Sequence, residues 1–232
     1  MDSQKLKKLE EKIGLRFKDK NLFLEALTHR SYLNENPEWP TPHNERLEFL
    51  GDAVLELAVT EELFNLFPEE DEGKLTSLRA ALVNYQILSR IAAESIQLED
   101  FVLLSRGEAK DTGRARDVIL ANAIESLLGA IYLDAGYVAS KGFVKAFVMN
   151  RLEEVIKTEA YKDPKSSLQE IAQAEQKVTP VYKIMEERGP DHAKVFVSGV
   201  YLGEKLVATG EGASKQDAEV EAARKALAEI RK

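Results

Sequence analysis

The chain has 232 residues, of which 44% are hydrophobic and 31% are charged, a composition typical of soluble globular proteins and not of disordered or fibrous ones. It contains no cysteine, which excludes a disulfide framework and a thiolate zinc site and fits a reducing compartment. The net charge of −8 belongs wholly to residues 1–160, because 12 Lys+Arg and 12 Asp+Glu balance in residues 161–232. An acidic N-terminal part attracts nucleic acid poorly, so such binding must use local patches.

The N-terminal residues give no sign of a targeting segment. They are charged from the start and lack the apolar core of a signal peptide. Farther along the chain, every 18-residue run is interrupted by polar residues, so we expect no membrane span. These features together predict a cytoplasmic protein.

Residues 1–157 are predicted to form an all-helical domain, because apolar residues recur at helical spacing throughout. Proline, glycine and acidic clusters mark the breaks between helices, at 34–42, 68–73 and 105–113. A polar connector follows at 158–163.

The segment 44–52 reads NERLEFLGD and places three carboxylates among leucines. On a helix, Glu45, Glu48 and Asp52 fall within an arc of roughly 60°. For an isolated match the usual interpretation is a solvated stripe on an amphipathic helix. A different interpretation needs support from elsewhere in the chain.

Residues 118–137 supply that support. The segment is apolar on nearly every face, which predicts a buried helix, yet it contains Asn122 and Glu125 on one side. A buried carboxylate needs a partner. One alternative is a salt bridge to Arg46 or Arg79; the other is a cation held between Glu125 and the stripe at 45–52.

Oxygen ligands without histidine or cysteine suit Mg²⁺ or Mn²⁺ rather than zinc. Gly51 and Gly129 lie near the acidic positions and would allow the two helix backbones to approach closely. The sequence therefore favours the interpretation that the stripe is half of a metal site.

The C-terminal part changes from helical to mixed patterning. Asp163 and Pro164 are a favourable helix start, as cap and first residue. A helix is expected to about residue 177, and a final helix opens with a capping-box-like SKQD at 214–217. Between them, three strands are predicted at 181–187, 193–200 and 205–212. The second domain, 164–232, is thus expected to be α-β-β-β-α.

At this point the residues carry a family resemblance. HNERLEFLGDAVL (43–55) closely resembles the signature motif of ribonuclease III endonucleases. Further segments resemble family blocks in the same order: LTHRSY (27–32), DEGKLTSLRAALV (71–83) and the 118–137 helix. The C-terminal domain is similar to a double-stranded RNA-binding domain through KSSLQEIAQ (165–173), GPDHAKVF (189–196) and GEGASKQDAEVEAA (210–223).

The resemblance implies a divalent-metal-dependent endoribonuclease that cuts duplex RNA to 5′-phosphate and 3′-hydroxyl ends. Its expected metal residues are Glu48, Asp52, Asn122 and Glu125. The expected catalytic residues are Asp52, Glu125 and Glu45, the last as an acidic residue that orients a ligand or water. Bound Mg²⁺, for which Mn²⁺ can substitute, would activate water and neutralise charge on the scissile phosphate.

Other implications concern partners and substrates. The family forms homodimers, and the apolar arc of the 44–58 helix, led by Phe49, would supply the interface; the alternative is ordinary core. Ribosomal RNA precursors and other structured transcripts are the expected substrates. The RNA-binding residues would be on the first helix, in the loop after Gly189, and at the start of the last helix: Ser166, Gln169, Glu170, Gln173, His192, Ser214 and Lys215.

Two departures from the family pattern matter. The family usually has aspartate where this chain has Asn122, and an amide ligates Mg²⁺ without adding negative charge. The basic run that usually opens the last helix is reduced to Lys215, which should weaken phosphate contact. The alternative hypotheses are a double-stranded RNA-binding protein whose nuclease site is impaired through Asn122, and a protein that mainly scaffolds RNA.

Overall fold

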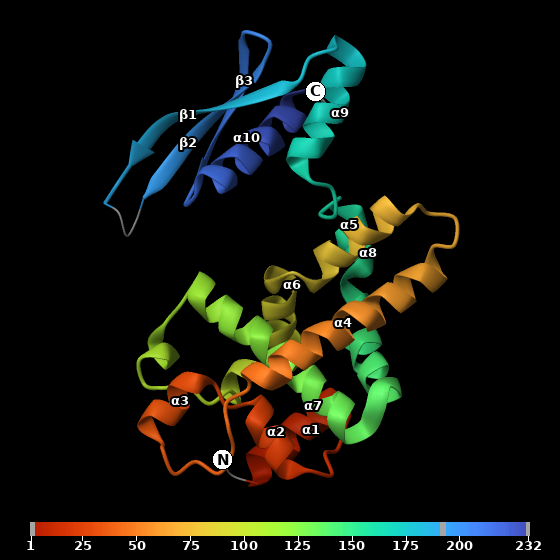
Figure 1. Cartoon of the computed structure of the whole chain (residues 1–232), viewed down its shortest axis with the longest axis vertical. Coiled ribbons are helices and arrows are strands. Elements are labelled where there is room, and N and C mark those ends of the chain that lie inside the picture. Colours follow the sequence, from red (N-terminus) through yellow and green to blue (C-terminus); the bar gives the residue numbers. More distant parts are fainter. Residues whose placement is uncertain (1–2, 191–193, 231–232) are drawn as a thin grey trace. The chain divides into compact units, whose positions relative to one another are not determined.

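The computed structural model describes residues 3–190 and 194–230 and contains two compact units (Figure 1). Contacts divide the chain between Tyr161 and Lys162, inside the polar connector expected at 158–163. The first unit is helical and the second has the order α-β-β-β-α, so the predicted fold class is confirmed.

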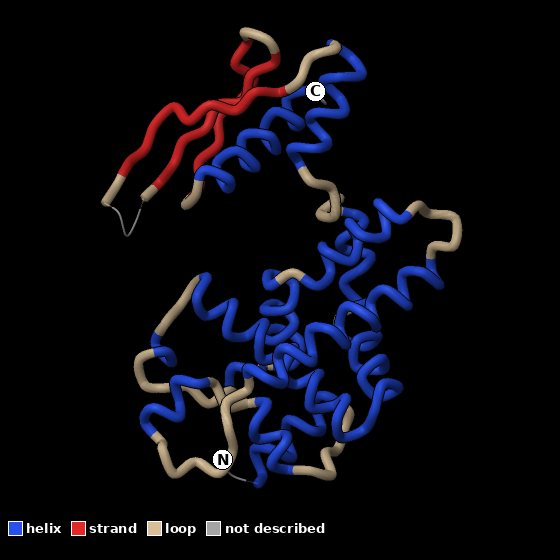
Figure 2. Tube along the Cα trace, in the orientation of Figure 1, coloured by secondary structure: helices blue, strands red, loops and turns tan. Residues whose placement is uncertain are grey.

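The helical unit is built almost entirely from helices joined by short loops, as the tube in Figure 2 shows. Its α-helices are α1 (Ser3–Ile13), α2 (Lys20–Ala26), α3 (Arg30–Glu35), α4 (Glu45–Leu66), α5 (Glu72–Val83), α6 (Tyr85–Arg90), α7 (Arg114–Phe147) and α8 (Leu152–Lys157). Short turns of other helix types are η1 (Ile91–Ile96), η2 (Leu98–Asp100), η3 (Glu108–Lys110) and η4 (Met149–Arg151).

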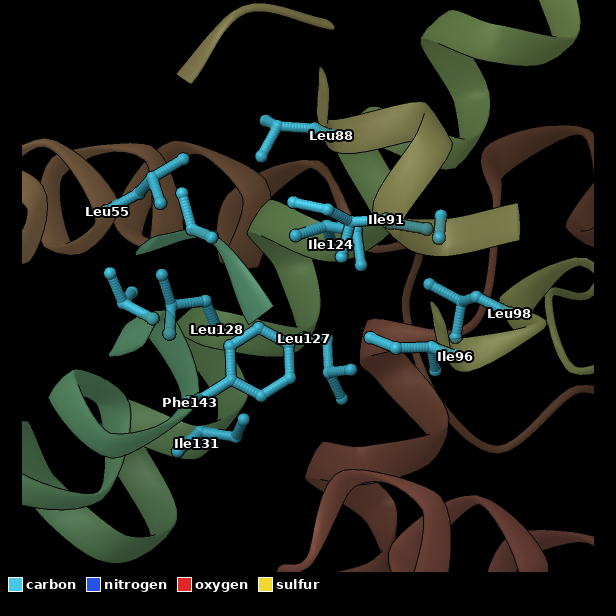
Figure 3. Close-up of a cluster of buried hydrophobic side chains, with 14 of the residues drawn as sticks. Leu55, Leu88, Ile91, Ile96, Leu98, Ile124, Leu127, Leu128, Ile131 and Phe143 are labelled. Atoms are coloured by element: carbon cyan, nitrogen blue, oxygen red, sulfur yellow. The ribbon is translucent and has the colours of Figure 1, made fainter. Parts of the chain in front are cut away.

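The core of this unit forms around α7, which lies against α4 and α6. Side chains from these helices and from η1 and η2 meet in one apolar cluster, drawn in Figure 3. Fully burying each such leucine, isoleucine or phenylalanine contributes about 1.5–3 kcal/mol. The residues labelled in that figure are Leu55, Leu88, Ile91, Ile96, Leu98, Ile124, Leu127, Leu128, Ile131 and Phe143.

Helix α7 is longer than the predicted 118–137 segment and is bent. Gly136 has φ 82° and ψ 177°, so the chain leaves helical geometry there and then resumes it. Beyond the bend, the Tyr137 hydroxyl donates to Glu61 of α4 at 2.5 Å and Lys141 pairs with the same carboxylate at 2.8 Å. By length and composition alone, the stretch 114–157 could cross a membrane. However, 56% of its most apolar 18-residue window is buried inside the unit.

The second unit places two helices on one face of a three-stranded antiparallel sheet. Its elements are α9 (Pro164–Gln176), β1 (Pro180–Arg188), β2 (Val195–Leu202), β3 (Lys205–Gly212) and α10 (Lys215–Ile230), with strand order β1-β2-β3. Leu168 and Val200 meet three small residues of α10, Ala222, Ala223 and Ala226, in a buried cluster. These alanines let α10 lie close to the sheet.

Candidate active site

The site begins with an unusually close contact between α4 and α7. A β-carbon placed on Gly51 would lie 1.8 Å from the backbone oxygen of Glu125, and one placed on Gly129 would lie 2.2 Å from that of Leu47. Only glycine leaves room for backbones this close. The close approach expected from Gly51 and Gly129 is therefore confirmed, and it brings the acidic faces of both helices together.

The predicted acidic residues occupy adjacent turns at this crossing. Glu45 and Glu48 are in the first turn of α4, and Asp52 is one turn further on. Glu48 and Glu125 are half-buried, whereas Glu45 and Asp52 are exposed. Desolvation raises the pKa of Glu48, as do the charges of Glu45 and Asp52. The polar Asn122 amide on α7 favours the ionised form of Glu48 and opposes that rise in pKa.

Glu125 is the most strongly perturbed member of the cluster. Burial raises the pKa of its carboxyl to about 7, and the negative charges of Asp52 and Glu48 add to the rise. Within residues 3–190 and 194–230, Glu125 has no ion-pair partner. Arg79 instead pairs with Glu56 of α4, with Nε and Oε2 2.7 Å apart. The alternative of a salt bridge from Glu125 to Arg46 or Arg79 is therefore wrong.

Glu45 differs from its neighbours because an arginine and a histidine lie close to its carboxylate. Its carboxylate lies 3.6 Å from Arg30 Nη1 and 3.8 Å from His43 Nδ1. Neither Arg30 nor His43 was among the predicted site residues. Both fall within the motifs LTHRSY and HNERLEFLGDAVL, so the sequence held a signal for them, but helix periodicity alone could not show that they reach Glu45.

The donor set fits a hard divalent cation. Glu48, Asp52 and Glu125 offer carboxylate oxygens, Asn122 can offer an amide oxygen, and mutual repulsion among the carboxylates would be relieved by a cation. In the described part of the chain, no three Asp, Glu or His side chains already surround one point. The carboxylates are thus electrostatic neighbours across the crossing and do not form a closed cage.

The predicted RNA-binding residues lie at two places in the second unit. Four of them, Ser166, Gln169, Glu170 and Gln173, are exposed on α9. Ser166 also completes the start of that helix, because its N–H and hydroxyl donate to Asp163 Oδ2 at 2.9 and 2.8 Å. His192 lies outside the described residues.

The other place is the first turn of α10. Ser214 Oγ accepts the Asp217 N–H at 3.1 Å and donates to the Asp217 carboxylate at 2.8 Å, so the capping-box-like opening expected at 214–217 is present, with the Ser214 hydroxyl and not its backbone N–H bonded to the carboxylate. Lys215 is exposed at the helix start, where free N–H groups favour anions.

Two family models together match most of the chain, one in each unit. Ribonuclease-III-like matches residues 19–152, and the double-stranded RNA binding motif matches residues 164–230. The chain belongs to the ribonuclease III family. It is a bacterial-type ribonuclease III, a double-strand RNA endonuclease with one nuclease domain and one double-stranded RNA-binding domain.

Relatives support this assignment along the full length. The chain is 44% identical over 227 residues to ribonuclease 3 of Carboxydothermus hydrogenoformans, covering 98% of this chain and 96% of the relative. It is 45% identical over 230 residues to that of Syntrophobacter fumaroxidans, covering 97% and 94%.

One solved structure aligns with the nuclease domain. It is the nuclease domain of ribonuclease III from Campylobacter jejuni, with a TM-score of 0.56, 43% identity, and coverage of 62% of this chain and 96% of that one. Its description concerns flexibility in a region involved in dimer formation. Ribonuclease III enzymes are generally metal-dependent, in keeping with the donor set at the α4–α7 crossing.

Proposed function

We propose that this ribonuclease III is a Mg²⁺-dependent enzyme whose metal is held by Glu48, Asp52, Asn122 and Glu125. The observation that carries the proposal is Glu125, a half-buried carboxylate that has no cationic partner among the described residues and faces two further carboxylates across the α4–α7 crossing. Such repulsion is costly unless a cation offsets it. Mn²⁺, which prefers the same oxygen donors, is expected to substitute.

Each part of the site then has a role. A bound Mg²⁺ would lower the pKa of an attacking water and offset charge on the scissile phosphate, giving 5′-phosphate and 3′-hydroxyl ends. The protein residues keep the donors in place: the glycine contact fixes the helix spacing, and the Asn122 amide favours the ionised form of Glu48. Glu45, held by Arg30 and His43, would orient a ligand or water from the exposed edge.

The second domain would supply most of the grip on duplex RNA. One exposed face of α9 presents hydroxyl, amide and carboxylate groups suited to 2′-hydroxyls and base edges in a shallow minor groove, from Ser166, Gln169, Glu170 and Gln173. Ser214 and Lys215 would meet phosphate at the start of α10, and His192 a second minor groove.

A homodimer formed through α4 is the remaining part of the proposal. Phe49, Leu57 and Phe64 are 83%, 56% and 69% exposed on this helix, far more than is usual for such large apolar side chains. A pocket of about 430 Å³ borders the far end of the same helix, lined by Leu63, Phe64 and Leu75 among others. In a two-fold pair of antiparallel α4 helices, Phe49 of one protomer would face that end of its partner.

A cleavage and binding assay with the full chain tests this function. Long duplex RNA should be cut in Mg²⁺ and spared in chelator, while single-stranded RNA of equal length is spared in both. Glu125→Gln should abolish cutting and leave duplex affinity in chelator nearly unchanged. Loss of binding together with cutting would instead indicate a structural role for Glu125.

The same assay addresses the alternative of a nuclease site impaired through Asn122. Cutting by the unmodified chain would exclude that alternative, whereas binding without cutting in either Mg²⁺ or Mn²⁺ would establish it. Structured transcripts, ribosomal RNA precursors among them, are the proposed substrates, and a cytoplasmic location belongs to the same proposal.

A further inference from the structure

The lysine at the start of α10 already has an anionic partner within its own domain. Lys215 Nζ lies 3.4 Å from Glu187 Oε1 and sits over the ring of Phe196, 5.8 Å from its centroid. The other oxygen of Glu187 lies 3.9 Å from Lys194 Nζ. Glu187 thus forms an ion pair with the same ammonium group that, in the proposed function, binds an RNA phosphate.

A β-bulge puts Glu187 in this position. The register of β1 against β2 shifts between Ile184 and Glu186, so one extra residue interrupts the alternation of side chains. Glu187 consequently pairs with Phe196, the residue whose ring lies under Lys215. Without the extra residue, Glu187 would point to the opposite face of the sheet.

We propose that Glu187 competes with RNA phosphate for Lys215 and thereby lowers the affinity of the second domain for duplex RNA. The inference rests on the proposed phosphate role of Lys215. Asp217, bonded to Ser214 in the same first turn, adds a second carboxylate near the site. Binding phosphate then exchanges one anion for another at Lys215, which reduces both the gain in affinity and its dependence on salt.

Fluorescence anisotropy of a labelled RNA duplex, titrated with the full chain in chelator at several salt concentrations, tests the proposal without cleavage. Glu187→Gln should tighten the Kd about two- to fivefold at low salt, the range expected for freeing an exposed ion pair. It should also steepen the salt dependence. Glu204→Gln is the matched control, because it makes the same change in net charge in the turn after β2, at the other end of that strand.

A third variant separates the competition by Glu187 from the phosphate role of Lys215. Lys215→Gln should weaken binding, and adding Glu187→Gln to it should bring no recovery. If Glu187→Gln acts no more strongly than Glu204→Gln, or still tightens binding when Lys215 is absent, the competition is disproved while the phosphate role stands. If Lys215→Gln leaves the Kd unchanged, the proposed role of Lys215 itself is wrong.

Discussion

Gly51 and Gly129 face each other across the α4–α7 crossing so closely that a β-carbon on Gly51 would lie 2.9 Å from the Gly129 backbone nitrogen. The same added atom would collide with the backbone oxygen of Glu125. The spacing of the two helices, and with it the spacing of the carboxylates they carry, is therefore set by the absence of side chains at these two positions.

Gly51→Ala should consequently destabilise the nuclease domain by about 3 kcal/mol or more, because backbone must move to admit the methyl group. Apparent metal affinity should fall with it, as the helices separate. Gly142→Ala is the control, since nothing lies within 4 Å of a β-carbon there, and it should be neutral or stabilise α7 slightly. Urea unfolding of both variants measures the difference; equal stabilities would contradict the assigned role of the contact.

The raised pKa of Glu125, about 7, predicts how stability depends on pH in the metal-free protein. A carboxyl whose folded pKa exceeds its unfolded value of 4.5 holds its proton more tightly in the folded state. Unfolding free energy should therefore fall as pH rises from about 4.5 through 7, by about 1–2 kcal/mol after allowance for partial exposure.

Chemical denaturation in chelator at pH 5.5, 7 and 8.5 measures this dependence. Glu125→Gln should remove most of it and raise stability at pH 8.5, because the amide is never ionised. A wild-type profile that rises over this interval would show that ionised Glu125 is not unfavourable in the folded state.

The identity of residue 122 leads to a prediction about the Mg²⁺ concentration that cleavage requires. As the proposed neutral ligand, Asn122 would leave the site with one fewer negative charge than an aspartate would, and a charge this near a divalent ion matters by about 1 kcal/mol or more. Asn122→Asp should then lower the Mg²⁺ concentration for half-maximal cleavage about fivefold. Mn²⁺ binding without RNA, followed by electron paramagnetic resonance, should tighten in parallel.

The opposite outcome has a definite meaning, because the Asn122 amide also favours the ionised form of Glu48. If supporting Glu48 in this way is its only role, the aspartate adds repulsion, and metal dependence stays unchanged or activity falls. Asn65→Asp, at the exposed end of α4, controls for the change in net charge.

The exposure of Phe49 leads to a prediction about the oligomeric state. Since its side chain is 83% exposed, Phe49→Ala should not affect folding of the protomer but should remove two buried aromatic anchors from a two-fold interface. Each contributes about 1.5–3 kcal/mol, so the dimer Kd should rise at least about 100-fold. Sedimentation equilibrium measures this, with Val181→Ala in the second domain as control; a dimer unaffected by Phe49→Ala would place the interface elsewhere.

The sequence predicted most of what local patterns determine. The α-β-β-β-α order, the acidic stripe of α4 and the glycine contact all followed from periodicity and from residues that tolerate only one environment. The bend at Gly136 was missed because the apolar pattern continues through it, and the contact of α7 with α4 beyond that point is a long-range one that periodicity does not reveal.

The partners of Glu45 and of Lys215 were missed for a related reason. Arg30 and Glu187 reach them from other elements, and Glu187 does so only because a bulge shifts the register of β1. Helical and strand periods describe which side of one element a residue occupies. They do not predict which charge on another element comes within reach of it.

The helix crossing also orders events during synthesis of the protein. Glu48 and Asp52 emerge from the ribosome long before Asn122 and Glu125, and the acidic half on α4 has no complement until α7 follows and docks. The proposed metal site therefore cannot be complete on a nascent chain until α7 has also been made. Late closure of this long-range contact would keep the nuclease silent during synthesis of the first part of its domain.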